Sequence, residues 1–233
     1  LDPDAVHTVH NGIDTHLWAP QEQTDALAKH GVDPDKPSVA FVGRITRQKG
    51  VPLLLKAALQ LPPEVQLVMC VGAPDTPELA AEVGALIDRL RREREGVVVI
   101  EGMLPRADIM QILSQASVFA CPSIYEPLGI VNLEAMACGT AVVASAVGGI
   151  PEVVRHEDTG LLVPIEQHDD ATGTPVDEAA FVADFAAALT RVLEEPELAT
   201  RMGRAGRERA VEHFSWETIA DRTLEVYESV LRG

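Results

Sequence analysis

Residues 125–137, YEPLGIVNLEAMA, decide how this chain folds, because they stand between two short apolar runs. The first run, ASVFACP, covers residues 116–122, and the second, TAVVA, covers residues 140–144. Apolar runs of this length are typical of buried strands, and the stretch between them predicts a sharp turn followed by a helix. A strand, a turn, a helix and a second strand form the repeating unit of a parallel sheet, in which ligands bind at the carboxyl edge of the strands.

Apolar runs suited to buried strands occur six times, at residues 38–42, 65–71, 97–100, 118–120, 141–144 and 160–163. Helical patterns fill the intervals between the early runs, at residues 51–60, 77–94 and 107–115. Strands that alternate with helices are joined by right-handed crossovers. The sequence therefore predicts an α/β fold with a doubly wound parallel sheet of about six strands.

The pattern changes after the last strand run. A polar loop is followed by three helix candidates, at residues 178–194, 197–210 and 216–231, with Pro196 at the start of the second and Ser215 as the cap of the third. We expect residues 38–165 to form the core that contains the sheet and residues 166–233 to form a helical part of the same domain. Residues 1–37 begin without methionine and contain several turn residues, which favours a linker in a piece of a longer polypeptide.

The formal net charge of −17 disfavours nucleic acid and anionic membranes as partners, because both would repel the chain. A bound phosphate would therefore need a local cluster of basic residues. No apolar stretch reaches the length of about 20 residues that a membrane helix needs, so we expect no membrane span. The three cysteines lie in or beside apolar segments and are expected to be buried and reduced, in a cytoplasmic protein.

Residues 43–50, GRITRQKG, form a basic cluster directly after the first strand. Gly43 allows the backbone to turn tightly, while Arg44 and Lys49 offer a planar fork and a point charge to anionic oxygens. The cluster has neither the spacing of a Walker loop nor a GxGxxG pattern. Taken alone, it is also consistent with a solvated basic start of a helix.

The loops after the first and fourth strands of a doubly wound sheet face one crevice. We therefore expect the basic cluster to meet the amino end of the helix that carries Glu134, where backbone amides and the helix dipole favour a phosphate or diphosphate. Glu126 and Glu134 could accept paired hydrogen bonds from sugar diols on either side of it. Alternatively, Glu126 is a partner of the helix dipole and Glu134 is merely exposed. Tyr125 is expected to pack at the end of the strand.

Six short motifs, taken in order, closely resemble retaining glycosyltransferases of family 4. They are NGID at 11–14, VGRI at 42–45, QKG at 48–50, PSIYEPLG at 122–129, EAMACG at 134–139 and GGIPE at 148–152. The resemblance extends over nearly the whole chain and implies the carboxyl-terminal, donor-binding half of a GT-B fold, with a Rossmann-like core. The wording of the motifs is most similar to the bacterial glycogen synthase type of enzyme.

The resemblance implies a role for each matched residue. Arg44 and Lys49 would hold the donor diphosphate and stabilise its charge as it leaves, while Glu126 would bind a hydroxyl of the donor sugar. Glu134 would bind the ribose diol. The phosphate cradle would be completed by Gly43 and by the backbone amides of Leu128, Gly129, Ile130 and Val131. The nucleobase would lie against Met103 and Leu104.

The resemblance also implies a reaction. Family members transfer a hexose with retention of configuration, with no metal and no cofactor besides the nucleotide-sugar donor. Here we expect glucose to pass from a nucleotide sugar, ADP-glucose, to an α-glucan or a sugar acceptor held by an amino-terminal domain that precedes residues 6–20. Without that domain the fragment should bind donor but transfer poorly. The open alternatives are a sugar phosphorylase or epimerase on the same scaffold, and a nucleotide-sugar-binding module without catalysis.

Overall fold

The computed structural model describes residues 6–170 and 172–232 and contains a parallel sheet of six strands. The strands are β1 (Ser38–Arg44), β2 (Gln66–Gly72), β3 (Val97–Glu101), β4 (Val118–Cys121), β5 (Val142–Ser145) and β6 (Gly160–Val163). They lie in the order β3-β2-β1-β4-β5-β6, and every neighbouring pair is parallel. The predicted doubly wound α/β fold is therefore confirmed, with each strand within two residues of its expected position.

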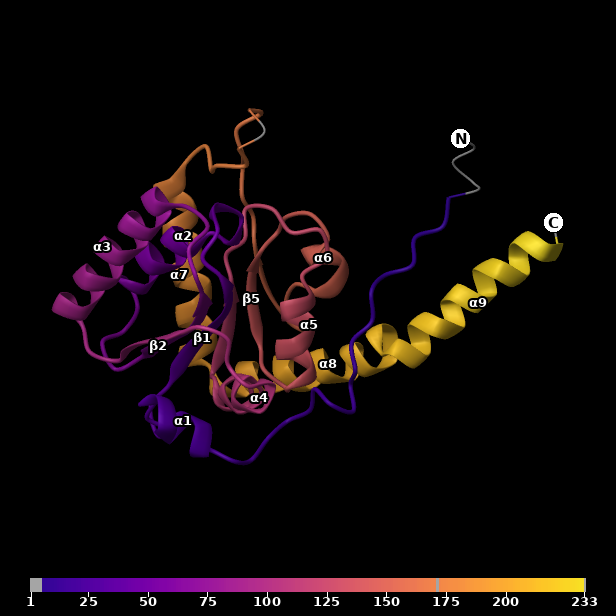
Figure 1. Cartoon of the computed structure of the whole chain (residues 1–233), viewed down its shortest axis with the longest axis horizontal. Helices are drawn as coiled ribbons and strands as arrows, with labels where there is room; N and C mark the ends of the chain where they lie inside the picture. Colours follow the sequence, from indigo (N-terminus) through magenta and orange to yellow (C-terminus); the bar gives the residue numbers. More distant parts are fainter. Residues whose placement is uncertain (1–5, 171, 233) are drawn as a thin grey trace.

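Helices cover both faces of the sheet (Figure 1). In chain order they are α1 (Asp25–His30), the 3₁₀ turn η2 (Arg47–Lys49), α2 (Val51–Ala58), α3 (Pro77–Glu93), α4 (Arg106–Gln115), α5 (Ile130–Ala137), α6 (Ile150–Val153), α7 (Glu178–Glu194), α8 (Pro196–Phe214) and α9 (Trp216–Arg232). One core lies between the sheet and helices α2, α3 and α7, and the other lies between the sheet and helices α1, α4, α5 and α6.

The two cores form because successive side chains of each strand point to opposite faces of the sheet. In β1, Val39 and Phe41 belong to the first core and Ala40 to the second, and β2 divides in the same way. Successive side chains of a strand point to opposite faces, so a strand that is buried on both faces must be apolar at every position. This requirement explains why the strands were visible in the sequence as continuous apolar runs.

The described part of the linker segment packs against the sheet domain. Ile13, Trp18, Leu27 and Val32 are buried in the second core; Leu27 lies in helix α1 and Val32 lies just after it. On the other side of the contact, the Arg207 guanidinium donates hydrogen bonds to the backbone oxygens of Thr15 and Trp18. Residues 13–32 are thus an integral layer of this fold rather than a free linker, because their apolar side chains lose contact with water there.

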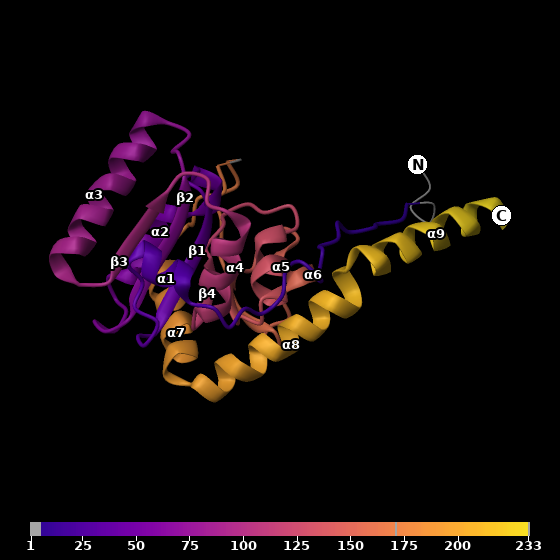
Figure 2. The ribbon, with the colours of Figure 1, turned by 60° about the horizontal axis from the view of Figure 1, so that its bottom comes forward.

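The three helices that follow the sheet begin where the sequence predicted. Pro196 occupies the first turn of α8, and the Ser215 hydroxyl accepts a hydrogen bond from Thr218 N, as a helix cap does. Helix α8 runs from the first core, at Leu198, to the second, at Phe214, and so crosses beneath the sheet (Figure 2). Helix α9 continues away from the body, on the side where residues 6–10 also leave it (Figures 1 and 2).

Two glycines in helix interiors give opposite stability predictions. A Cβ on Gly203 in α8 would lie 2.1 Å from the backbone oxygen of Gly139, whereas a Cβ on Gly84 in α3 would meet nothing within 4 Å. Gly203→Ala should therefore destabilise the chain by about 1–3 kcal/mol through overpacking. Gly84→Ala should stabilise it by about 0.5–1 kcal/mol through the loss of backbone freedom in the unfolded chain. Urea denaturation measures both, and stabilisation by Gly203→Ala would contradict the close packing of α8.

Candidate functional site

The site forms where the sheet reverses its winding. Strand β1 lies between β2 and β4, so the chain proceeds outward in one direction through β2 and β3 and in the other through β4 to β6. The loops that follow β1 and β4 therefore diverge to opposite faces of the sheet and leave a crevice between them at its carboxyl edge. The basic cluster begins with the last two residues of β1 and continues into the loop after it, and Glu126 lies in the loop after β4, residues 122–129, which we call the Glu126 loop.

The two loops touch through their backbones. Ile124 N donates a hydrogen bond to the backbone oxygen of Gln48 at 2.9 Å. Gly50 has a φ of +63°, and a Cβ at this position would lie 1.9 Å from the backbone oxygen of Pro122. Only glycine fits there, both because of the backbone angle and because of the close approach. Gly50 thus fixes the distance between the basic cluster and the Glu126 loop.

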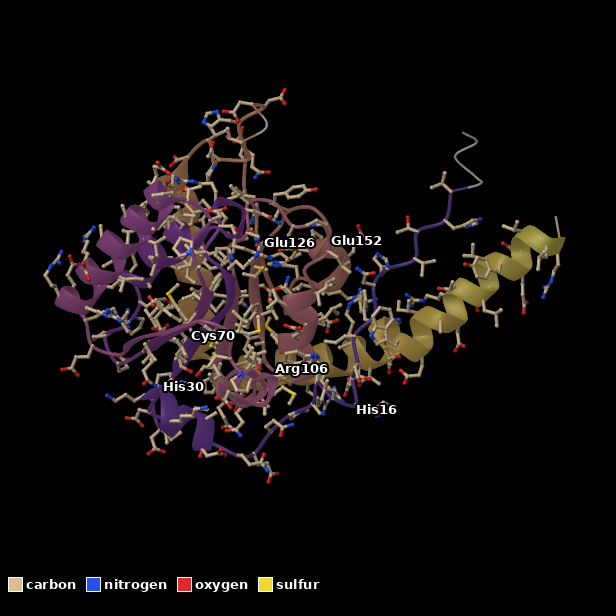
Figure 3. The ribbon with its side chains drawn as sticks, viewed as in Figure 1. His16, His30, Cys70, Arg106, Glu126 and Glu152 are labelled. Atoms are coloured by element: carbon tan, nitrogen blue, oxygen red, sulfur yellow. The ribbon has the colours of Figure 1, made fainter. Side chains whose placement is uncertain are left out.

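An ion pair joins the predicted phosphate ligand to the predicted sugar ligand. Lys49 Nζ lies 2.5 Å from Glu126 Oε2, with side chains that are 20% and 9% exposed. The Ser123 hydroxyl donates a second hydrogen bond to the same oxygen at 3.4 Å. The structure therefore brings Lys49 and Glu126 together as expected, and it adds Ser123, a residue of the 122–129 motif to which the sequence analysis gave no role. Figure 3 labels Glu126.

A third loop, after β5, closes on the Glu126 loop from the other side. A Cβ on Gly148 would lie 2.1 Å from the Glu126 backbone oxygen, and a Cβ on Gly149 would lie 2.2 Å from that of Pro127. Gly149 N also donates a hydrogen bond to the Glu126 backbone oxygen at 2.9 Å. Residues 126–127 are therefore packed closely against the loop after β5, and this contact fixes the position of the Glu126 backbone.

Helix α5 begins at this junction with Gly129 as its N-cap, at a φ of +89° and with no side-chain cap. An uncapped helix start presents backbone amides and the positive end of the dipole to an anion. Ile130, in the first turn, is 43% exposed, so this end of the helix is open to the surroundings. The geometry suits the predicted cradle of residues 128–131, whose role in phosphate binding stays a prediction.

Glu134 lies one turn further along α5 and is partly buried. Burial raises the pKa of its carboxyl to about 7, and the nearby Arg106 guanidinium lowers that pKa to a smaller extent. Glu134 is therefore not the merely exposed carboxylate that one alternative supposed. Figure 3 labels Arg106, which the sequence did not single out.

Four predicted residues line one hollow of about 560 Å³ beside this junction: Gly43, Arg44, Met103 and Leu104. Cys70 forms part of its wall, and burial raises the pKa of this thiol to about 12, so it serves as an apolar surface. Met103 is fully exposed at the rim. Lys49, Glu126 and Glu134 do not line the hollow, so the predicted residues form two groups at the same sheet edge, one around the hollow with Arg44 and one around the Lys49–Glu126 ion pair.

Tyr125 does not pack at the strand end. Its side chain is 62% exposed, because the neighbouring positions Ile124 and Glu126 take the buried places on either side of it. The expectation from the sequence was therefore wrong. An aromatic ring at the mouth of the crevice offers a flat apolar face to a ligand.

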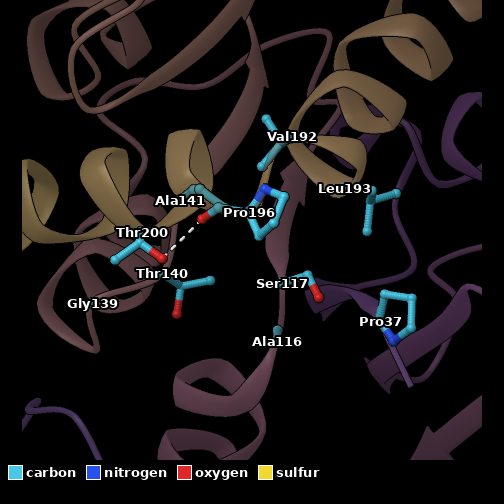
Figure 4. A pocket seen from close by; sticks show the side chains of 11 residues that line it. Pro37, Ala116, Ser117, Gly139, Thr140, Ala141, Val192, Leu193, Pro196 and Thr200 are labelled. Atoms are coloured by element: carbon cyan, nitrogen blue, oxygen red, sulfur yellow. Dashed lines mark hydrogen bonds between the residues drawn. The ribbon is translucent and has the colours of Figure 1, made fainter. Parts of the chain in front are cut away.

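A second hollow, of about 330 Å³, lies at the opposite edge of the sheet (Figure 4). Its polar side chains have partners: Thr200 Oγ1 donates to the backbone oxygen of Pro196 at 2.8 Å, and Thr140 Oγ1 donates to that of Leu113. Ser117 Oγ accepts a hydrogen bond from Ser38 N. This hollow lacks the charged groups of the carboxyl edge, which remains the candidate functional site.

The described residues contain no group of three or more histidine, cysteine, aspartate or glutamate side chains that could hold a metal ion. No helix in ranges 6–170 and 172–232 is long and apolar enough to cross a membrane. Cys70, Cys121 and Cys138 are free and buried, as expected. The other expectations about metals and partners stay predictions.

The sequence model of the family described as glycosyl transferases group 1 matches residues 22–209. The chain belongs to this family. It is 55% identical over 233 residues to the alpha-maltose-1-phosphate synthase of Mycolicibacterium smegmatis, and the match covers 99% of the chain and 58% of that protein. The chain thus spans about three fifths of the length of this relative.

Two solved structures share the fold. Sucrose-phosphate synthase from Thermosynechococcus elongatus is 34% identical with a TM-score of 0.74, over 97% of this chain and 53% of the other. Anabaena HepE in complex with UDP-glucose is 25% identical with a TM-score of 0.79, over 96% and 57% of the two chains. The chain is therefore a Rossmann-like half of a GT-B glycosyltransferase, as the motifs implied.

The raised pKa of Glu134 predicts a pH-dependent stability. A carboxyl whose pKa is about 7 in the folded chain and about 4.5 in the unfolded chain makes folding less favourable as the pH rises between these values. The wild type should therefore lose stability relative to Glu134→Gln from about pH 4.5 to about pH 7, and the difference should be constant above. Urea denaturation at several pH values measures this difference.

The variant Arg106→Met tests whether the Glu134 carboxyl causes this pH dependence. Because the Arg106 charge lowers the pKa of Glu134 in the folded chain, its removal should extend the loss of stability to higher pH, while the onset near pH 4.5 stays the same. Parallel stability curves for the wild type and Glu134→Gln would show that the carboxyl is not perturbed in the folded chain.

Proposed function

We propose that this chain is the donor-binding half of a retaining glucosyltransferase that transfers glucose from a nucleotide sugar, ADP-glucose, to a sugar phosphate. The observation that carries the proposal is the contact between Lys49 and Glu126, which sets a cation for the diphosphate beside a carboxylate for the sugar. Similarity to HepE, whose structure contains UDP-glucose, supports a nucleotide sugar as the donor class.

Breaking the bond between the sugar and the diphosphate builds negative charge on the leaving phosphate. Lys49, Arg44 and the uncapped start of α5 would stabilise that charge without moving during the reaction. Glu126 would orient the transferred sugar through a hydroxyl, and Glu134 would accept hydrogen bonds from the ribose diol. These groups would do the work that a divalent metal does in other transferases, so the proposal requires no metal.

A phosphorylated acceptor has more support than the α-glucan of a glycogen synthase. The relatives are named for phosphorylated sugars, alpha-maltose 1-phosphate in one and sucrose phosphate in the other. A glucosyl transfer that makes maltose 1-phosphate must join glucose to a glucose phosphate. The acceptor would be held by the part of the relatives that this chain does not span, so the isolated chain is proposed to bind donor without efficient transfer.

Nucleotide-sugar binding is tested by thermal shift. ADP-glucose should raise the Tm of the chain, because a ligand that binds only the folded state stabilises it. Lys49→Ala should abolish this rise, measured from the variant's own baseline. Lys56→Ala should keep it, since Lys56 pairs with Glu178 on the outer surface of α2 and α7. No stabilisation of the wild type by ADP-, UDP- or GDP-sugars would refute the proposal.

The acceptor is tested with the full-length enzyme. Glucose from ADP-glucose should pass to glucose 1-phosphate at least about tenfold faster than to glycogen, which corresponds to about 1.4 kcal/mol of transition-state preference. Product analysis by mass spectrometry distinguishes a phosphorylated disaccharide from an extended glucan. Phosphate-dependent release of glucose phosphate from maltose or glycogen would instead favour a phosphorylase.

A further inference from the structure

Asn132 is an anomaly in the interior of this protein. It lies in the first turn of α5 with its side chain fully buried, and among residues 6–170 and 172–232 neither Nδ2 nor Oδ1 finds a hydrogen-bond partner. An unpaired buried polar group costs about 1–3 kcal/mol, and an apolar side chain of the same size would avoid that cost. A buried side-chain amide without a hydrogen-bond partner therefore indicates that its partner is present in another state of the protein.

The surroundings of the Asn132 amide identify that partner. A Cβ placed on Gly129 would lie 2.5 Å from Asn132 Nδ2 and 3.4 Å from Glu126 Cγ. The amide and the glutamate side chain therefore lie on the same side of Gly129, within a few ångströms of one point. Ile150 provides the remaining near neighbour there, and its side chain offers no polar atom.

The hydrogen bonds that Glu126 makes explain why Asn132 has none. Lys49 and Ser123 both donate to Oε2, so the carboxylate is turned toward the loop after β1. A diphosphate in the crevice competes for the Lys49 ammonium, because it carries more negative charge than one carboxylate. Glu126 then shares or loses its cation at a position that is only 7% exposed, where a buried carboxylate needs another donor.

We propose that Asn132 is a positioning residue, whose Nδ2 donates a hydrogen bond to the Glu126 carboxylate when a nucleotide sugar occupies the site. The bond fixes the carboxylate in the orientation that receives the sugar hydroxyl. The unpaired amide is then the cost of keeping this donor in place. The inference rests on the proposed function, since it assigns Glu126 to the sugar.

The test compares the affinity for a nucleotide sugar with the affinity for the nucleotide alone. Asn132→Leu should bind ADP-glucose about tenfold more weakly than the wild type, as expected for the loss of one hydrogen bond to a charged group, and should bind ADP with unchanged affinity. Isothermal titration gives both constants. The variant should also be at least as stable as the wild type in urea, because it buries no unpaired amide.

Thr140→Val is the matched control, because Thr140 is also buried but its hydroxyl already donates to the Leu113 backbone oxygen. This variant should lose stability and keep the wild-type ratio of ADP-glucose to ADP affinity. Asn132→Ala serves if the leucine variant does not fold, and its affinity ratio should fall in the same way.

The side-chain amide signals of Asn132 provide an independent measurement on the wild type. In a ¹H–¹⁵N spectrum they should move downfield with ADP-glucose and much less with ADP. Equal affinity of Asn132→Leu and wild type for ADP-glucose would overturn the inference, and so would an equal loss for both ligands. A wild-type chain that binds no nucleotide sugar would instead overturn the proposed function and the inference together.

Discussion

The carboxyl edge of this protein depends on the contact between the loop after β1 and the loop after β4. Gly50 lies directly against the Pro122 backbone, and this approach places Lys49 at hydrogen-bond distance from Glu126. Any larger residue at position 50 would separate the loops and also the two charges. The contact lies at the switch point of the sheet, where a doubly wound fold leaves its crevice. The contact of Gly50 with the Pro122 backbone therefore determines both the packing of the two loops and the position of the ion pair.

Several polar groups at this junction are removed from water. Lys49 and Glu126 are both largely removed from water, and the attraction between two buried charges only repays their desolvation when the geometry is good. Glu134 adds a carboxyl whose burial opposes ionisation, and Asn132 adds an unpaired amide. Four polar groups in two adjacent loops and one short helix would be a poor choice for stability alone. Such concentrations of unfavourable groups are characteristic of functional sites.

The sequence predicted the sheet well because each strand had to be apolar on both faces, which leaves a continuous run such as residues 65–71. It did not predict α1, a helix of only six residues that is held by tertiary contacts rather than by its own periodicity. Residues 13–32 looked like a linker because their buried side chains are widely spaced. Only the folded chain shows that these side chains share one core.

The sequence predicted which loops meet at the candidate site but not the details of their contacts, and the reason differs from residue to residue. Lys49 and Glu126 were expected in one crevice, because loops at a switch point converge. The exposure of Tyr125 depends on which of three consecutive side chains points inward, which a short loop does not reveal. Asn132 falls on the buried side of α5, as the spacing of its apolar neighbours requires, but a missing hydrogen-bond partner can be recognised only when every neighbouring atom is placed.

Support for the costly groups on α5 comes from the far side of that helix, where α8 packs against it. Gly206 faces Met136 at close range, and Gly203 lies against the Gly139 backbone just beyond the helix end. Arg207 donates a hydrogen bond to the Ala137 backbone oxygen and others to the segment that precedes α1. The carboxyl end of α5 is thus tied to α8 and to the chain that leads into the domain. Because a rigid helix transmits a shift at one end to the other, a movement of that incoming segment would reach the uncapped amides at Gly129. If the proposed nucleotide sugar binds at the start of α5, its binding and the position of the segment before α1 are expected to be coupled through α5 and Arg207.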